Sequence, residues 1–254
     1  MTVIHALLRR FALALLVAAA SGCATLPPDA GQNPADPWEA YNRNVALFNE
    51  GVDSLIVKPL AQIYDGVVPQ PVRTCIGNIL DNLRMVPTTL NRLLQAEIDL
   101  FGHGIGRLLV NTTVGFAGCF DAASDLGIPA QYSDFGVTLG KWGVDPGPYF
   151  VLPLLGPSTV RDAAGRIPGD FLNPQIQLRQ ASQYPVYFTV DVLDTRSRLF
   201  PVEKRLEETG LDRYTAVRDF YLDRRRRLVG GEINAPLPVY EDPGDDPPAP
   251  AASK

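Results

Sequence analysis

The chain has 254 residues, of which 46% are hydrophobic, and it carries a formal net charge of −5. This length is enough for one sizeable core or two small ones, and the negative charge gives no indication of nucleic-acid binding. The histidines His5 and His103 are too few for a zinc site with several histidine ligands. The sequence also has no Walker motif and no G-x-S-x-G elbow. We therefore expect no metal and no cofactor, and nothing in the sequence points to an enzyme.

Residues 1–22 have the features of a lipoprotein signal peptide. Arg9 and Arg10 precede an apolar run, Phe11 to Ala20, that is too short to span a bilayer. Small residues then lead to Cys23, which predicts cleavage before this cysteine and its lipidation. Ordinary secretion with an incidental cysteine is the alternative.

Residues 23–35 follow the cleavage site without hydrophobic periodicity, and we interpret them as a tether between a lipid anchor and the folded domain. Ala24 occupies the position where an aspartate would signal retention in the inner membrane, so the sequence favours the outer membrane.

Asp36 and Pro37 predict the start of a helix that ends at Lys58-Pro59. Four apolar residues share one stripe of this helix, and three of them are aromatic, which is typical of a helix lying in a membrane interface. These candidate membrane-facing residues are Trp38, Tyr41, Val45 and Phe48. Asn42 and Asn49 fall on the other side. Core packing is the alternative for each residue of the stripe.

Three further helices are predicted over Val72–Met85, from Thr88 onward after a break at Pro87, and over Ile98–Leu109. Gly102, Gly104 and Gly106 in the last of these lack the strand and lysine of a phosphate loop, so we interpret them as close helix packing or bending.

Cys75 and Cys119 are the two cysteines that remain besides Cys23. An exported chain meets an oxidising compartment, so these two residues are a candidate disulfide. Two buried free thiols are the alternative.

The stretch from Asp134 to Asp162 alternates glycines and prolines with large apolar side chains. Glycine permits unusual backbone angles and proline fixes φ. We expect a rigid, apolar, irregular loop with a short strand at Tyr149–Leu152 or a hairpin.

Beyond this stretch we expect a connector from Gly165 to Pro174, then helices over Gln175–Leu199, Pro201–Gly210 and Asp212–Val229. The basic run Arg224–Arg227 is interpreted as a solvated helix end, with a contact to anionic lipid headgroups as the alternative. Residues 232–254 are acidic and proline-rich and are predicted to be disordered.

The Asp134–Asp162 stretch resembles the signature of the VacJ/MlaA family of outer-membrane lipoproteins. Other segments resemble the same family in the same order: Asp36-Pro37-Trp38-Glu39, Pro69-Gln70-Pro71-Val72-Arg73, Asn91-Arg92-Leu93-Leu94-Gln95 and Asn111-Thr112-Thr113. The resemblance covers residues 36–231, which we interpret as one helical domain.

The resemblance implies a mostly all-α fold, with a ring of amphipathic helices around a central channel in the inner leaflet of the outer membrane. It also implies the function of the family, which is to remove mislocalised phospholipids from the outer leaflet and so maintain lipid asymmetry. The implied partners are phospholipids, a trimeric porin and a periplasmic lipid-binding protein.

We interpret nine residues of the glycine- and proline-rich stretch as the candidate rim or gate of such a channel. These residues are Gly140, Trp142, Gly143, Gly147, Pro148, Tyr149, Pro153, Gly156 and Pro157. Two other functions remain open at this point. One is a structural or scaffold lipoprotein that binds porins without moving lipid, and the other is a phospholipid hydrolase that uses His103.

Overall fold

The computed structural model describes Leu26 and residues 30–172 and 184–231. The predicted signal peptide, Cys23, the tail 232–254 and the first part of the predicted helix Gln175–Leu199 therefore lie outside the described residues. The elements in chain order are α2 (Glu39–Val52), the π-helical turn η1 (Asp53–Val57), α3 (Lys58–Val67), α4 (Gln70–Leu94), α5 (Ile98–Thr113), α6 (Ala122–Asp125), α7 (Phe135–Lys141), β1 (Tyr149–Leu152), β2 (Gly156–Thr159), α8 (Val160–Phe171), α10 (Tyr184–Arg198), α11 (Phe200–Thr209) and α12 (Arg213–Gly230).

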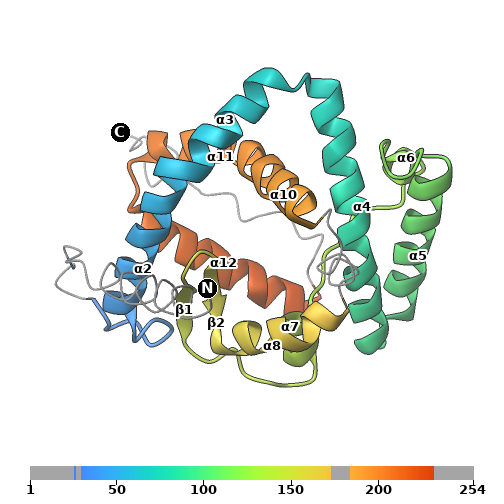
Figure 1. Cartoon of the computed structure of the whole chain (residues 1–254). Helices are drawn as coiled ribbons and strands as arrows, with labels where there is room; N and C mark the ends of the chain where they lie inside the picture. Colours follow the sequence, from blue (N-terminus) through green and yellow to red (C-terminus); the bar gives the residue numbers. More distant parts are fainter. Residues whose placement is uncertain (1–25, 27–29, 173–183, 232–254) are drawn as a thin grey trace, which may run out of the picture.

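The helices form a closed frame, with one helix inside it (Figure 1). α2, α3 and α4 follow one another around the frame; α4 contacts α7, and α7 contacts α12. The hairpin of β1 and β2 closes the circuit, because β2 contacts α12 and β1 contacts α2. α10 lies inside the frame against α3 and α4, whereas α5 and α6 lie outside α4 (Figure 1). The predicted mostly helical fold with a hairpin is confirmed.

The predicted helix end at Lys58-Pro59 is wrong. The chain continues from α2 through η1 into α3, where Pro59 lies in the first turn. Proline is tolerated there because the first N–H groups of a helical segment need no intrahelical acceptor. Asp36 is not the N-cap either: Trp38 holds that position, and the Asp36 carboxylate accepts hydrogen bonds from Asn42 and Tyr214.

The predicted break at Pro87 is also wrong, since α4 is one helix of 25 residues with Pro87 inside it. The Oγ1 of Thr89 donates to the carbonyl of Met85, and the side chain of Asn91 donates to that of Pro87. Side chains thus bond to the backbone around the proline, and packing against α5 and α7 stabilises the helix on both sides of it.

The Asp134–Asp162 stretch is more regular than the predicted loop. Asp134 caps α7 by accepting a hydrogen bond from the N–H of Val137. β1 has the predicted bounds, Tyr149–Leu152, and pairs antiparallel with β2. The connector predicted from Gly165 is instead part of α8, which contains Pro168. Because Gly165 lacks a side chain, α8 can approach the backbone of Gly136 in α7. A Cβ at Gly165 would lie 2.9 Å from the backbone nitrogen of Gly136.

The two C-terminal helices agree with the prediction to within a few residues. Gly210 is the C-cap of α11 and Gly231 is the C-cap of α12, and both glycines have positive φ, at 65° and 82°. Glycine adopts this left-handed conformation without steric cost, which explains both helix ends. Asp212 caps α12 by accepting a hydrogen bond from the N–H of Thr215.

Candidate functional site

The described part of the chain has a polar interior. Nine hydrophobic residues are buried there, compared with twenty polar or charged ones. Soluble proteins show the opposite distribution, because buried charges are costly unless they are paired and hydrogen-bonded. The fully buried side chains here include the guanidinium of Arg92, which donates to Glu97 at 2.5 Å and to the carbonyl of Tyr132 at 2.9 Å.

The surface is correspondingly apolar. Leu55 and Phe171 are each 80% exposed, and Phe116 is 78% exposed. Many more large apolar side chains are exposed on the outer helices: Leu47, Ile56, Leu60, Ile63 and Val67 on α2 to α3, and Ile98, Ile105 and Leu109 on α5. A surface of this kind requires an apolar environment or a partner. Among the described helices, none is both long enough and apolar enough to cross a membrane.

The predicted membrane-facing stripe is only partly correct. Trp38 and Tyr41 are exposed, and Phe48 is half-buried. Val45 is wrong for this role, because it is 1% exposed and packs in the core with Tyr149 and Val151. The polar side of α2 faces inward instead.

Two asparagines on α2 hold the hairpin, and this explains the orientation of the helix. The Oδ1 of Asn42 accepts from the N–H of Val151 at 2.8 Å, and its Nδ2 donates to the carbonyl of Tyr149 at 3.1 Å. One heptad later, Asn49 accepts from the N–H of Leu154 at 2.7 Å and donates to the carbonyl of Leu152 at 3.0 Å. The two amides satisfy the free edge of β1 as a neighbouring strand would.

The nine candidate rim residues separate into two groups. Gly140, Trp142 and Gly143 lie at the end of α7, where the indole N–H of Trp142 donates to the carbonyl of Leu94 at 3.1 Å. The other six belong to the hairpin and the turn before it: Gly147, Pro148, Tyr149, Pro153, Gly156 and Pro157. Tyr149 is wrong as a rim residue, because its ring lies in the core between Tyr214 and Tyr221.

An ionic cluster connects the two ends of the Asp134–Asp162 stretch. Arg225 of α12 donates to both carboxylate oxygens of Asp134, at 2.5 and 2.9 Å, and to Asp162 Oδ1 at 2.8 Å. The hydroxyl of Tyr221 donates to Asp162 Oδ2 at 2.8 Å. The same arginine thus fixes the start of α7 and the first turn of α8 relative to α12.

The charges of this cluster stabilise one another. Burial alone would raise the pKa of Asp134, but the hydrogen bonds and charge of Arg225 outweigh it and lower the pKa to about 2. Burial alone would lower the pKa of Arg225, and Asp134 and Asp162 raise it above its usual range. The interpretation of Arg224–Arg227 as a solvated helix end is therefore wrong for Arg225, which is 5% exposed, while Arg226 is exposed.

Cys75 and Cys119 are joined in the structure with an S–S distance of 2.09 Å. Cys75 lies on α4, and Cys119 lies in the turn between α5 and α6. The bond fixes this turn, in which Phe116 and Ala117 have positive φ, against α4.

His103 has no catalytic surroundings among the described residues. It is exposed on α5, and no hydroxyl or carboxylate bonds to it. Asp121 caps α6 and pairs with Arg107 at 2.7 Å. No group of histidine, cysteine and acidic residues in the described ranges could hold a metal ion.

Buried side chains that are mostly polar, together with many exposed apolar ones, are typical of a helical protein that associates with a membrane or with an apolar partner. The family model described as "MlaA lipoprotein" matches residues 34–228, and the chain belongs to this family.

Named relatives and a solved structure support the same family assignment. The "Intermembrane phospholipid transport system lipoprotein MlaA" of Escherichia coli K12 is 33% identical over 231 residues, which is 89% of this chain and 91% of the relative. The Haemophilus influenzae protein of the same name is 30% identical over 191 residues, or 73% and 76% of the two chains. A solved structure described as "Structural basis for maintenance of bacterial outer membrane lipid asymmetry" has a TM-score of 0.66 and 30% identity, and it covers 76% of this chain and 98% of the other.

The local pattern of the sequence did not reveal the roles of Asn42, Asn49 and Arg225. Their partners lie far away in sequence, so helical periodicity alone could not identify them. A weak signal was present in α2, where the two asparagines are spaced by one heptad and therefore lie on one face.

Proposed function

We propose that this chain is the outer-membrane lipoprotein of an intermembrane phospholipid transport system. It removes phospholipids mislocalised in the outer leaflet and passes them through a channel to a periplasmic lipid carrier. The family and the names of the relatives support this proposal. The single observation that carries it is the polar interior behind an apolar surface.

The physical reason is the cost of moving a headgroup through an apolar layer. A charged phosphate costs several kcal/mol to bury without partners. A frame that presents arginine, asparagine and hydroxyl groups inward lowers this cost, while its apolar exterior contacts acyl chains. The sequence carries no Walker motif, so the chain acts as a conduit and does not drive transport itself.

The proposed location is the inner leaflet of the outer membrane, with the lipid on Cys23 as the anchor. The exposed apolar faces of α3 and α5 suit contact with acyl chains or with a membrane protein such as a trimeric porin. The periplasmic lipid-binding protein of the pathway receives the phospholipid.

The glycine- and proline-rich segment Gly140–Pro157, apart from the buried Tyr149, is our proposed rim or gate. Gly147 and Gly156 have φ of +64° and +79°, so a branched side chain at either position is strained. Replacing both by valine should change the amount of phospholipid in the outer leaflet, whereas an unchanged amount would exclude the hairpin as a gate.

The experiment that tests the function is an assay of outer-leaflet phospholipid in cells that lack the gene. The readout is acylation of lipopolysaccharide by a phospholipid-dependent outer-membrane acyltransferase. We expect acylation to rise, to return to normal with the wild-type chain, and to stay high with Cys23→Ala.

No rise in the mutant cells would favour the scaffold function, in which the chain binds envelope partners without moving lipid. The hydrolase function has its own test. His103→Ala should restore normal acylation fully, because His103 is exposed and no catalytic partner bonds to it in the described structure; loss of complementation would support a hydrolase.

A further inference from the structure

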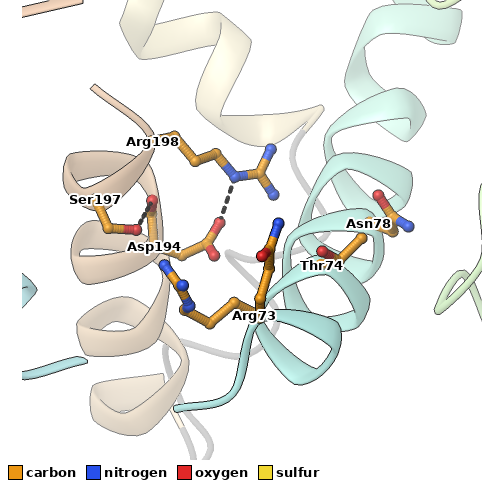
Figure 2. A pocket seen from close by; sticks show the side chains of 7 residues that line it. Arg73, Thr74, Asn78, Asp194, Ser197 and Arg198 are labelled. Carbon is orange, nitrogen blue, oxygen red and sulfur yellow. Dashed lines mark hydrogen bonds and ion pairs between the residues drawn. The ribbon is translucent and has the colours of Figure 1, made fainter. Parts of the chain in front are cut away.

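A polar cavity of about 310 Å³ lies between the first turns of α4 and the end of α10. Figure 2 shows side chains that line this cavity: Arg73, Thr74 and Asn78 on α4, and Asp194, Ser197 and Arg198 on α10. Because α10 lies inside the helical frame (Figure 1), the cavity belongs to the interior that we propose lipids cross.

The cavity contains charges whose bonding capacity is only partly used. Asp194 is 2% exposed; its Oδ1 accepts from the hydroxyl of Tyr64 at 3.2 Å. Its Oδ2 lies 2.8 Å from Arg198 Nε, an ion-pair contact drawn in Figure 2, but accepts no hydrogen bond. The Nε of Arg73 is buried and donates to no acceptor. A buried guanidinium N–H is costly without an acceptor, and the Asp194 carboxylate, which contacts Tyr64 and Arg198, has lone pairs for a further donor.

The other bonds of the two arginines go to exposed carboxylates. Arg198 Nη1 donates to Asp81 at 2.7 Å, and Arg73 pairs with Asp65. The side chains of Asp81 and Asp65 are 49% and 41% exposed. Exposed ion pairs contribute little to stability, so a ligand phosphate can replace these carboxylates at small cost.

The balance of charge selects the kind of ligand. Two guanidinium groups, of Arg73 and Arg198, and one carboxylate, of Asp194, line the cavity. The arginines attract an anion and the buried carboxylate attracts a cation, so a zwitterion suits this lining better than a simple anion does. A phosphate between the arginines and an ammonium beside Asp194 would each find the opposite charge.

Two uncharged hydrogen-bond donors lie at the end of the cavity where a phosphate would contact the arginines. The amide of Gln70 and the hydroxyl of Thr74 also line the cavity and have no hydrogen-bond partner in the described structure. Gln70 begins the 25-residue helix α4, whose N-terminus favours an anion. Gly77 lets Arg198 lie across α4, because a Cβ at this position would be 1.6 Å from Arg198 Nη2.

We propose that this cavity binds the headgroup of a zwitterionic phospholipid with a primary ammonium, the phosphate between Arg73 and Arg198 and the ammonium on Asp194. This inference rests on the proposed function, since it names the headgroup that the conduit favours. A quaternary ammonium has no N–H to donate to Asp194, so phosphatidylcholine should bind less tightly than phosphatidylethanolamine.

The test measures binding of soluble short-chain lipids to the purified, lipidated full chain in a nonionic detergent by isothermal titration calorimetry. The probes are dihexanoyl phosphatidylethanolamine, phosphatidylcholine and phosphatidylglycerol. We expect the first to bind about tenfold more tightly than the last, as for one charge-assisted hydrogen bond. Equal affinity for the three probes would overturn the proposal.

Three variants locate the site. Asp194→Asn should abolish the preference for phosphatidylethanolamine over phosphatidylglycerol. Thr74→Val and Gln70→Leu should weaken binding of both lipids by several-fold; neither side chain has a partner in the described structure, so neither change should disturb folding. Arg226→Gln on α12 is the control, because this side chain is 78% exposed and its one ion pair within the described residues is with Asp223.

A retained preference in Asp194→Asn, or unchanged affinity in Thr74→Val and Gln70→Leu together, would contradict the assignment. Competition by inorganic phosphate as strong as competition by phosphoethanolamine would identify a simple anion site and overturn it too. The cell assay separates the two proposals: wild type that restores normal acylation but binds all probes equally refutes only the headgroup site, whereas failure to restore acylation refutes the function.

Discussion

The side-chain oxygen of Asn42 accepts a hydrogen bond from the backbone N–H of Val151 at 2.8 Å. Asn42 is fully buried, and its amide also donates to the carbonyl of Tyr149 and to Asp36. A side chain on α2 therefore takes the place of a third strand in the sheet.

Asn42→Ala should destabilise the protein by about 2–5 kcal/mol, because it leaves several buried polar groups without partners. Asn49→Ala is the matched comparison: its contacts lie nearer the exposed tip of the hairpin, and we expect about 1 kcal/mol. The measurement is the free energy of unfolding by urea in one detergent. Equal losses in the two variants would show that Asn42 has no special role.

Arg225→Gln should lower the free energy of unfolding by about 3–5 kcal/mol, because it leaves the carboxylates of Asp134 and Asp162 without their shared cation. Arg226→Gln, one residue later and exposed, should cost less than about 0.5 kcal/mol. Thermal unfolding of both variants checks the difference, and similar midpoints would mean that the cluster does not stabilise the fold.

The lowered pKa of Asp134 predicts a specific dependence on pH. Its ordinary pKa is 3.8 and its folded value is about 2, so its stabilising effect is complete above about pH 4 and disappears as the pH falls through 2. Asp134→Asn should therefore be less stable than wild type at pH 7, and the difference should shrink between pH 4 and 2. Urea unfolding at pH 7, 4 and 2.5 measures it; a difference that does not change with pH would contradict the assigned cause.

The bond between Cys75 and Cys119 closes a loop with a sequence separation of 44. Replacing both cysteines by serine should lower the free energy of unfolding by about 3–4 kcal/mol, mainly because the unfolded chain gains conformational entropy when the bond is absent. Mass spectrometry of the purified protein, with and without reduction before alkylation, checks the pairing. Alkylation of either thiol without reduction would indicate two free cysteines instead.

Two glycines on α5 provide a matched pair. A Cβ at Gly104 would lie 2.3 Å from Thr89 Oγ1 on α4, whereas a Cβ at Gly102 meets nothing within 4 Å. Gly104→Ala should destabilise by about 1–3 kcal/mol through overpacking, and Gly102→Ala should stabilise by about 0.5–1 kcal/mol. The same sign of change for both would argue against close packing of α4 and α5 at this point.

Sequence reasoning worked best where the cause of a structure is local. β1 was predicted with its observed bounds, and the helix predicted over Asp212–Val229 is α12, which the Asp212 side chain caps and Gly231 ends. These signals depend on the backbone preferences of a few neighbouring residues, which tertiary contacts leave unchanged here.

Sequence reasoning failed where contacts with residues distant in the sequence determine the local structure. Pro59, Pro87 and Pro168 were each interpreted as lying at the end of a helix or in a connector, yet all three lie inside helical segments. For Pro87 and Pro168, packing of the helix outweighs the local cost of a proline in a helix interior, about 3 kcal/mol; Pro59 lies in the first turn of α3, where proline is tolerated. Likewise, helical periodicity placed Val45 in the predicted membrane-facing stripe. Asn42 and Asn49 instead turn that side of α2 inward, because they bond to hairpin residues more than one hundred positions away in the sequence.

The π-helical turn Asp53–Val57 sets the rotational phase of the helices on either side of it. Ala61 in α3 is fully buried, as Asn42 in α2 is, and it lies nineteen positions further along the chain. Five turns of regular α-helix take about eighteen residues, so an unbroken helix would rotate Ala61 by about 100° toward the surface. The widened turn absorbs the surplus residue. A relative with one residue fewer in this segment would therefore form a plain α-helix here and bury the same face, whereas a further insertion would turn the apolar side of α3 inward.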